Sequence, residues 1–217
     1  MSTFACPTCG GQVAFASGTP FAVCRYCKAL LTRNDVTVES VGQAATVPDD
    51  FSPLQLGVTG RYDNRPFHVV GRLRKVWEEG SWNEWCVSFE DGHFGWLAEA
   101  QGDLVMTFEQ AAAAVSRLPD ARKAADLRPG ALVDIGSSRF SITDVKQVKC
   151  LGAEGELTDV FKNGEAVLSV DLRGAGLEFA TVEYRSGEVT AFVGRFVEFA
   201  ECRFSNLRRL AGWDAPR

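Results

Sequence analysis

"LQLGVTGRYDNRPFHVVGRLRKV", residues 54–76, aligns without a gap with "LRPGALVDIGSSRFSITDVKQVK", residues 127–149, at a constant offset of 73. The alignment matches a leucine, a glycine and a phenylalanine in each copy: Leu54 with Leu127, Gly57 with Gly130, and Phe67 with Phe140. Apolar and polar residues alternate within the first copy, which is typical of a strand with one buried face. The two stretches therefore predict an internal repeat of a β unit.

A hairpin is predicted after each copy, in "CVSFEDGHFGWL" (residues 86–97) and in "TVEYRSGEVTAFV" (residues 181–193). Each places a glycine turn between alternating apolar residues. Aligning Gly92 with Gly187 needs an offset of 95, so the second copy carries an insertion of 22 residues. We assign the insertion to residues 159–170, where Asn163-Gly164 predicts an additional hairpin.

Short strands, glycine turns and the absence of βαβ spacing predict a mainly β fold. We expect two tandem small antiparallel β-barrel-like repeats, SH3-like or rolled-sheet, at residues 54–118 and 119–217. The helical pattern of residues 108–127 is interpreted as the connector between them.

Upstream, "ACPTCGGQVAFASGTPFAVCRYCKALL" (residues 5–31) contains two Cys-x-x-Cys pairs separated by fourteen residues. Two such turns facing each other supply the four thiolates of a tetrahedral zinc site. We predict a zinc ribbon at residues 1–39, with one structural Zn²⁺, followed by a linker at residues 40–53. The predicted ligands are Cys6, Cys9, Cys24 and Cys27.

A redox dithiol is the alternative interpretation of the first pair. That chemistry needs the first cysteine at a helix N-terminus that follows a strand, and residues 1–5 are too few to form such a strand. The other three cysteines, Cys86, Cys150 and Cys202, are expected to be core thiols. An odd number of unpaired cysteines favours a reducing compartment, and no apolar run approaches the roughly 18 residues of a membrane span, so we expect a cytoplasmic protein.

The charge is unevenly distributed along the chain. The net charge is −5, but residues 1–34 carry three basic and no acidic residues, which leaves −8 on the remainder. Nucleic-acid binders generally present a basic surface, so any such contact would have to involve the ribbon. Arg25, Tyr26 and Lys28 at the second cysteine turn are the candidate residues for it.

The stretches "LGVTGRYDNRPFHVVGRLRKV" and "WNEWCVSFEDGHFGWLAEAQGDLVMTFE" resemble the bacterial domain of unknown function 4178 family. Such domains can occur in tandem and can follow an N-terminal zinc ribbon. Members tend to be encoded near polyamine-synthesis-like enzymes, small membrane proteins and membrane-stress proteins. The resemblance thus implies an accessory role in an envelope-stress or polyamine-linked system, with peripheral membrane association but no insertion, and it transfers no catalytic residue.

Four of the five tryptophans fall within twenty residues of the first copy. Trp85 shares one side of its segment with Val87 and Phe89. The stretch "WEEGSWNEW", residues 77–85, reads as a loop or exposed hairpin, so Trp82 is predicted to be substantially exposed. We predict an apolar patch with an acidic rim, suited to a basic or amphipathic partner segment, from Trp82, Trp85, Trp96, Glu79 and Glu84.

The sequence is compatible with three functions. The first is a non-enzymatic zinc-containing adaptor that binds protein partners. The alternative is an RNA-binding or ribosome-associated zinc-ribbon protein. The third is a cryptic enzyme with a site near His93, which sits beside Glu90 and Asp91 in a turn that is also ordinary hairpin chemistry.

Overall fold

The computed structural model describes residues 2–15, 18–34, 36–115, 118, 127–159, 164–185 and 187–212. The fold is mainly β and its strand pairs are antiparallel, as predicted. The only helix among the described residues is α1 (Ala112–Val115). Half of the predicted helical connector, including residues 119–126, lies outside the described residues.

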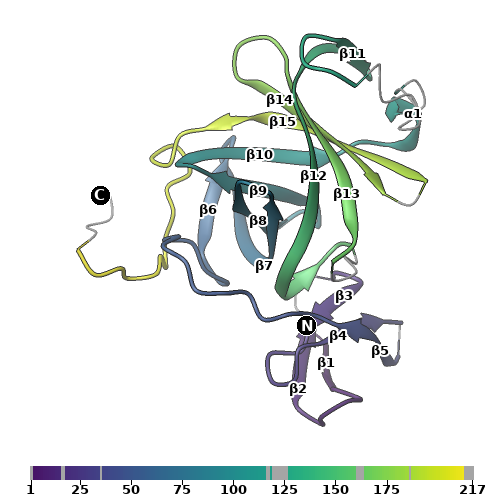
Figure 1. The fold of residues 1–217 in the computed structure, drawn as a ribbon. Helices are drawn as coiled ribbons and strands as arrows, with labels where there is room; N and C mark the ends of the chain where they lie inside the picture. Colours follow the sequence, from purple (N-terminus) through teal and green to yellow (C-terminus); the bar gives the residue numbers. More distant parts are fainter. Residues whose placement is uncertain are drawn as a thin grey trace.

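The N-terminal part contains five short strands, at the bottom of Figure 1. They are β1 (Ser2–Ala5), β2 (Gln12–Phe15), β3 (Phe21–Val23), β4 (Ala29–Arg33) and β5 (Val38–Gln43). β1 and β2 form a separate hairpin, whereas β3, β4 and β5 belong to the large sheet. β5 enters the stretch for which a linker was expected.

Ten further strands form two consecutive antiparallel meanders. The first meander consists of β6 (Thr59–Tyr62), β7 (Arg65–Trp77), β8 (Gly80–Phe89), β9 (Phe94–Ala100) and β10 (Asp103–Glu109). The second consists of β11 (Leu132–Ile135), β12 (Ser138–Leu157), β13 (Ala166–Arg173), β14 (Glu178–Arg185) and β15 (Glu188–Val197).

The opening hairpins of the two meanders have the same register at the offset of 73. Thr59 pairs with His68 in the first, and Leu132 pairs with Ser141 in the second. The alignment of Gly92 with Gly187 was wrong in strand order, because Gly92 lies between β8 and β9 whereas Gly187 lies between β14 and β15. Among the described residues both meanders have five strands, so the insertion adds no strand there.

The extra length of the second copy lies partly in β12, which has 20 residues where β7 has 13. The segment expected to form an added hairpin, residues 159–170, instead connects β12 to β13 and supplies the start of β13. Residues 160–163, including Asn163, lie outside the described residues. The Asn-Gly signal thus falls in the connection between β12 and β13.

Two strand pairs join the meanders: β7 with β12 and β10 with β15. They complete a closed cycle of eight strands in the order β7, β8, β9, β10, β15, β14, β13, β12 (Figure 1). We expected two separate small barrels, and the structure has one 13-stranded sheet. The physical reason is that an unpaired strand edge exposes N–H and C=O groups, which the other meander satisfies here.

Each meander nevertheless keeps its own hydrophobic core. The first core contains Phe67, Val69, Trp85, Val87, Leu97 and Met106. The second contains Phe140, Ile142, Val170, Leu172, Ala180 and Val182. Because side chains alternate along a strand, the other face of each meander is left for the space between them.

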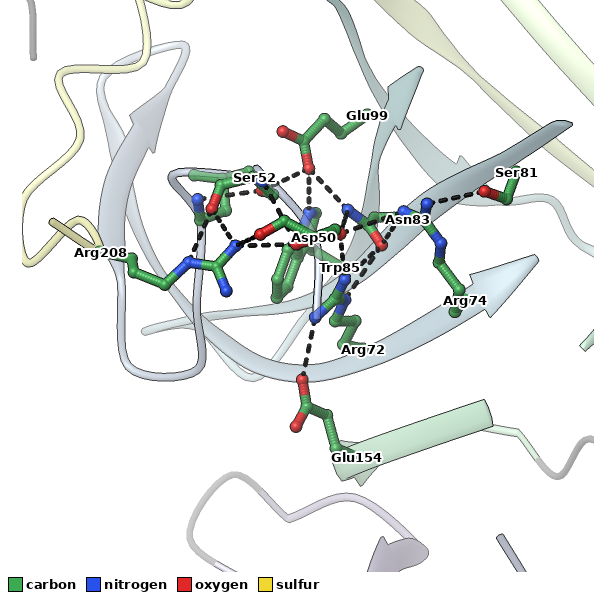
Figure 2. Close-up of polar contacts among 11 residues, drawn as sticks. Asp50, Ser52, Arg72, Arg74, Ser81, Asn83, Trp85, Glu99, Glu154 and Arg208 are labelled. Carbon is green, nitrogen blue, oxygen red and sulfur yellow. Dashed lines mark hydrogen bonds and ion pairs between the residues drawn. The ribbon is translucent and has the colours of Figure 1, made fainter. Parts of the chain in front are cut away.

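Two extended segments cross the first meander and are fastened by a polar network (Figure 2). Arg208 donates to Asp50 Oδ1 at 2.8 Å, and Asn83 donates to Asp50 Oδ2 at 2.9 Å. Arg72 pairs with the same carboxylate, and its side chain is almost completely buried. The network therefore ties the chain before β6 and the chain after β15 to β7 and β8.

Candidate functional site

Four cysteine thiols meet between the two N-terminal turns. The Sγ atoms of Cys6, Cys9, Cys24 and Cys27 all lie within 4.8 Å of one another. The two turns are built alike: Cys6 N donates to Gly11 O at 2.8 Å, and Cys24 N donates to Ala29 O at 2.9 Å. Four converging thiols at these separations suit a tetrahedral metal ion with soft ligands.

The two cysteine turns pack closely against each other at Gly11 and Tyr26. A Cβ on Gly11 would lie 2.3 Å from the Tyr26 ring, so only glycine fits beneath that ring. Burial alone would raise the pKa of Cys6, but N–H groups of Thr8 and Cys9 outweigh it and lower the pKa to about 7. The Ala29 N–H alone would lower the pKa of Cys27, but burial and the three neighbouring thiols raise it to about 12. The thiolate is the form that binds a metal.

The N-terminal strands are joined to the rest of the molecule through the pairing of β3 with β12. Phe21–Val23 pair with Gly155–Leu157, and the Thr19 hydroxyl donates to Glu156 Oε2 at 3.0 Å in a buried position. Val23 and Leu30 share a core cluster with Leu157 and Trp96. The cysteine site is therefore connected by packing to the inside of the strand cycle.

A cavity of about 690 Å³ lies between the two meanders. All eight strands of the cycle contribute to its wall, from the faces opposite the two cores. β8, for example, directs Trp82 and Glu84 into the cavity and Trp85 into the core of the first meander. The alternation along each strand thus builds the two cores and the cavity at once.

The cavity wall is predominantly acidic. Its described residues include nine acids and four bases. The acids are Glu79, Glu84, Asp103, Glu109, Asp144, Asp159, Asp171, Glu183 and Glu188, and the bases are Lys75, Lys146, Arg173 and Arg185. A concave site with an excess of one charge focuses its field and attracts ligands of the opposite charge.

A buried lysine lies in the wall between two carboxylates. Lys75 Nζ lies 2.9 Å from Glu84 and also pairs with Glu183. Burial alone would lower the pKa of Lys75, but Glu183 and Glu84 outweigh it and raise the pKa above its usual range. Burial raises the pKa of Glu84 despite the neighbouring ammonium group. Lys75 is thus held charged in a position where it cannot act as a nucleophile.

Two aromatic pairs also line the cavity, each with a cation above a ring. Trp77 and Trp82 have centroids 5.3 Å apart, and Lys146 Nζ lies 5.0 Å from the Trp77 centroid. Phe179 and Phe196 have centroids 5.5 Å apart, and Arg173 Cζ lies 3.6 Å from the Phe196 centroid. The wall therefore contains aromatic faces that stabilise positive charge.

The structure brings four of the five predicted partner-binding residues to this cavity: Trp82, Trp96, Glu79 and Glu84. Trp85 does not belong with them. It is fully buried on the opposite face and donates its indole N–H to Glu99 at 3.0 Å. Its shared parity with Val87 and Phe89 was the sequence signal for this position. Trp82 is half-buried instead of substantially exposed, because its ring lies against Trp77.

The remaining candidates lie elsewhere. Tyr26 is 56% exposed, and Arg25 lies over its ring at 4.7 Å, at the second cysteine turn beside Lys28. His93 is an exposed turn residue whose Nδ1 lies 3.0 Å from Asp91, outside the cavity wall. Cys86, Cys150 and Cys202 are buried, as expected, and burial raises the pKa of each thiol.

Sequence reasoning missed the contribution of the second meander. Lys146, Asp171, Arg173, Phe179 and Glu183 all face the cavity. The available signal was the alternation in "VLSVDLR" and "EFATVEYR", where polar or aromatic residues occupy every second position. That pattern was interpreted only as strand periodicity, because polar residues on one face usually mark the solvent side.

Comparison with known proteins adds a family but no characterised relative. No curated protein and no solved structure matches the chain. Among the described residues, no helix has the length and apolar character needed to cross a bilayer. Residues 55–199, which make up most of the chain and include both meanders, match the family described as "Domain of unknown function (DUF4178)". The chain belongs to the DUF4178 family.

Proposed function

We propose that the protein is a non-enzymatic adaptor that accepts a basic, amphipathic segment of a protein partner in the cavity between the meanders. The observation that carries the proposal is the excess of acids in a wall that also presents aromatic rings. Acidic groups attract lysine and arginine, and tryptophan faces bind both their charged ends and neighbouring apolar side chains. Trp82, Trp96, Glu79 and Glu84 would form part of this contact.

The proposed adaptor contains one structural Zn²⁺, bound by the four clustered thiols. Zinc would supply rigidity at the turns that hold β3 against β12, and four thiolates leave it no open position for chemistry. The shared register of the opening hairpins supports the further proposal that the meanders are tandem copies of one unit. The reduced thiols of a zinc site would be maintained in the cytoplasm.

The proposal is tested with a synthetic peptide of alternating lysine and leucine residues, titrated calorimetrically at two salt concentrations. Glu79 and Asp103 line the cavity and are exposed, so a Glu79→Gln/Asp103→Asn double variant removes charge with little effect on folding. We expect it to weaken binding about tenfold, equivalent to two contacts of ~0.7 kcal/mol each. Higher salt should weaken wild-type binding.

The matched control is a Glu90→Gln/Asp49→Asn double variant, which removes the same charge from exposed positions outside the cavity. It should bind the peptide as the wild-type protein does. Equal weakening in both variants would show that the acidic protein attracts the peptide without using the cavity, and the proposal would then be wrong.

A further inference from the structure

Arg173 differs from the other three bases of the cavity. Lys75, Lys146 and Arg185 each pair with at least one carboxylate. Within the described part of the chain, the Arg173 side chain has no hydrogen bond or ion pair, and its recorded contacts are with Phe196 and Phe179. It therefore presents a positive charge, in a mostly acidic wall, that no carboxylate of the described residues neutralises.

The contact with Phe196 orients this guanidinium group. Its central carbon lies 3.6 Å from the ring centroid, so one face of the planar group covers the ring. The N–H groups of a guanidinium lie in its plane and point outward from its edge, so stacking leaves them available. A fixed guanidinium edge matches the two oxygens of a carboxylate.

A carboxylate without a basic partner lies on the strand next to that of Phe196. Phe196 pairs with Val105 on β10, and Asp103 lies two residues along the same strand face. Asp103 and Glu79 both line the cavity and have no ion pair among the described residues. An unneutralised cation and unneutralised anions thus share one wall, which is complementary to a ligand that carries both charges.

We infer that the cavity binds the carboxyl-terminal end of the partner segment, with the terminal carboxylate on Arg173 and a lysine ammonium near Asp103. The inference rests on the proposed function, since it specifies which part of a basic segment enters. Free carboxylate and lysine side chains occur together at such a chain end. An internal segment of basic and apolar residues alone carries no carboxylate and would leave Arg173 without a partner.

The test compares the lysine–leucine peptide with a free carboxyl end and with an amidated end, on wild-type protein and on Arg173→Gln. Amidation makes the peptide more positive, so the acidic cavity as a whole favours the amidated form. We nevertheless expect amidation to weaken wild-type binding roughly tenfold, since a charge-assisted contact is lost. Arg173→Gln should lose this preference and bind the amidated form at least as tightly as the free form.

Arg128→Gln is the matched control, because Arg128 is an exposed arginine outside the cavity wall. It should retain the full preference for the free carboxyl end. The inference is overturned if the wild-type protein binds both forms equally or prefers the amidated one, and also if Arg173→Gln retains the preference. In each of these outcomes the Glu79→Gln/Asp103→Asn variant still weakens binding more than its control, whereas failure of the proposed function shows as equal weakening in those two variants.

Discussion

Arg208 Nη2 lies 2.8 Å from Asp50 Oδ1, although the two residues are separated by almost three quarters of the chain. Arg208 also donates through Nε to Ser52 O at 2.9 Å (Figure 2). Asp50 precedes the first meander and Arg208 follows the last strand. This ion pair therefore joins the segment before the first meander to the segment after the second meander.

Replacing Asp50 should destabilise the whole protein. Its side chain is only 13% exposed and pairs with Arg72, Arg74 and Arg208. Asp50→Asn leaves three guanidinium groups without their shared carboxylate, so we expect a loss of about 3 kcal/mol in the free energy of unfolding, measured in urea. Asp49→Asn, at the exposed neighbouring position, should change it by less than about 0.5 kcal/mol. Equal losses in the two variants would contradict a special role for Asp50.

The same carboxylate should set part of the acid sensitivity. Burial alone would raise the pKa of Asp50, but Asn83, Arg208 and Arg72 outweigh it and hold the pKa below its usual value. The folded state therefore binds this proton less readily than the unfolded state. The resulting stability is present above the unfolded pKa and is lost as the pH falls through the folded pKa. Between about pH 5 and pH 2, unfolding free energy should fall less steeply in Asp50→Asn than in the wild-type protein.

Metal removal should act on the cysteine turns first and on the part of β12 that pairs with β3 second. We expect one zinc ion per chain by elemental analysis. A chelator should increase amide hydrogen exchange in residues 2–33 and at Gly155–Leu157, because β3 pairs there. The first meander core, around Trp85, should stay protected. Cys6→Ser should reproduce the effect, whereas Cys202→Ser, outside the cluster, should keep the metal. Unchanged exchange after chelation would show that the ribbon folds without metal.

Trp82 and Trp85 should behave oppositely on truncation. Trp85 is fully buried in the first core, so Trp85→Ala should cost about 4 kcal/mol of unfolding free energy. Trp82 is half-buried in the cavity wall, so Trp82→Ala should cost less than about 2 kcal/mol but abolish binding of the lysine–leucine peptide. Thermal unfolding and calorimetry on both variants measure the difference. A loss of stability in Trp82→Ala as large as that in Trp85→Ala would assign Trp82 to packing alone.

The β class and the cysteine cluster could be predicted because each depends on residues that are close in sequence. Register in the opening hairpins follows from a two-residue turn, which is why the offset of 73 survives in the pairing of Thr59 with His68 and of Leu132 with Ser141. The parity of Trp85 with Val87 and Phe89 indicated a core position, so its assignment to the exposed patch was wrong.

The cavity could not be predicted because it depends on which strand edges meet. The sequence of β12 does not indicate that Cys150–Gly155 pair with Gly71–Lys75 on β7. It is equally compatible with a longer pairing between β12 and β13. Without the pairing of β12 with β7, Asp171, Arg173 and Glu183 read as a solvent-facing row. The glycine at position 71 was a sign of close approach, since a Cβ there would lie 1.8 Å from Glu156 O. A single glycine does not identify the strand that approaches it.

The pairings of β7 with β12 and of β10 with β15 involve the second strands and the fifth strands of the two meanders. Strands that hold the same place in their meanders thus pair with each other in antiparallel fashion, which is compatible with a two-fold axis. A family member with a single meander would have both of these edges unpaired, and a second copy of the same chain could satisfy them. We expect such a chain to be a homodimer, with its cavity formed at the subunit interface.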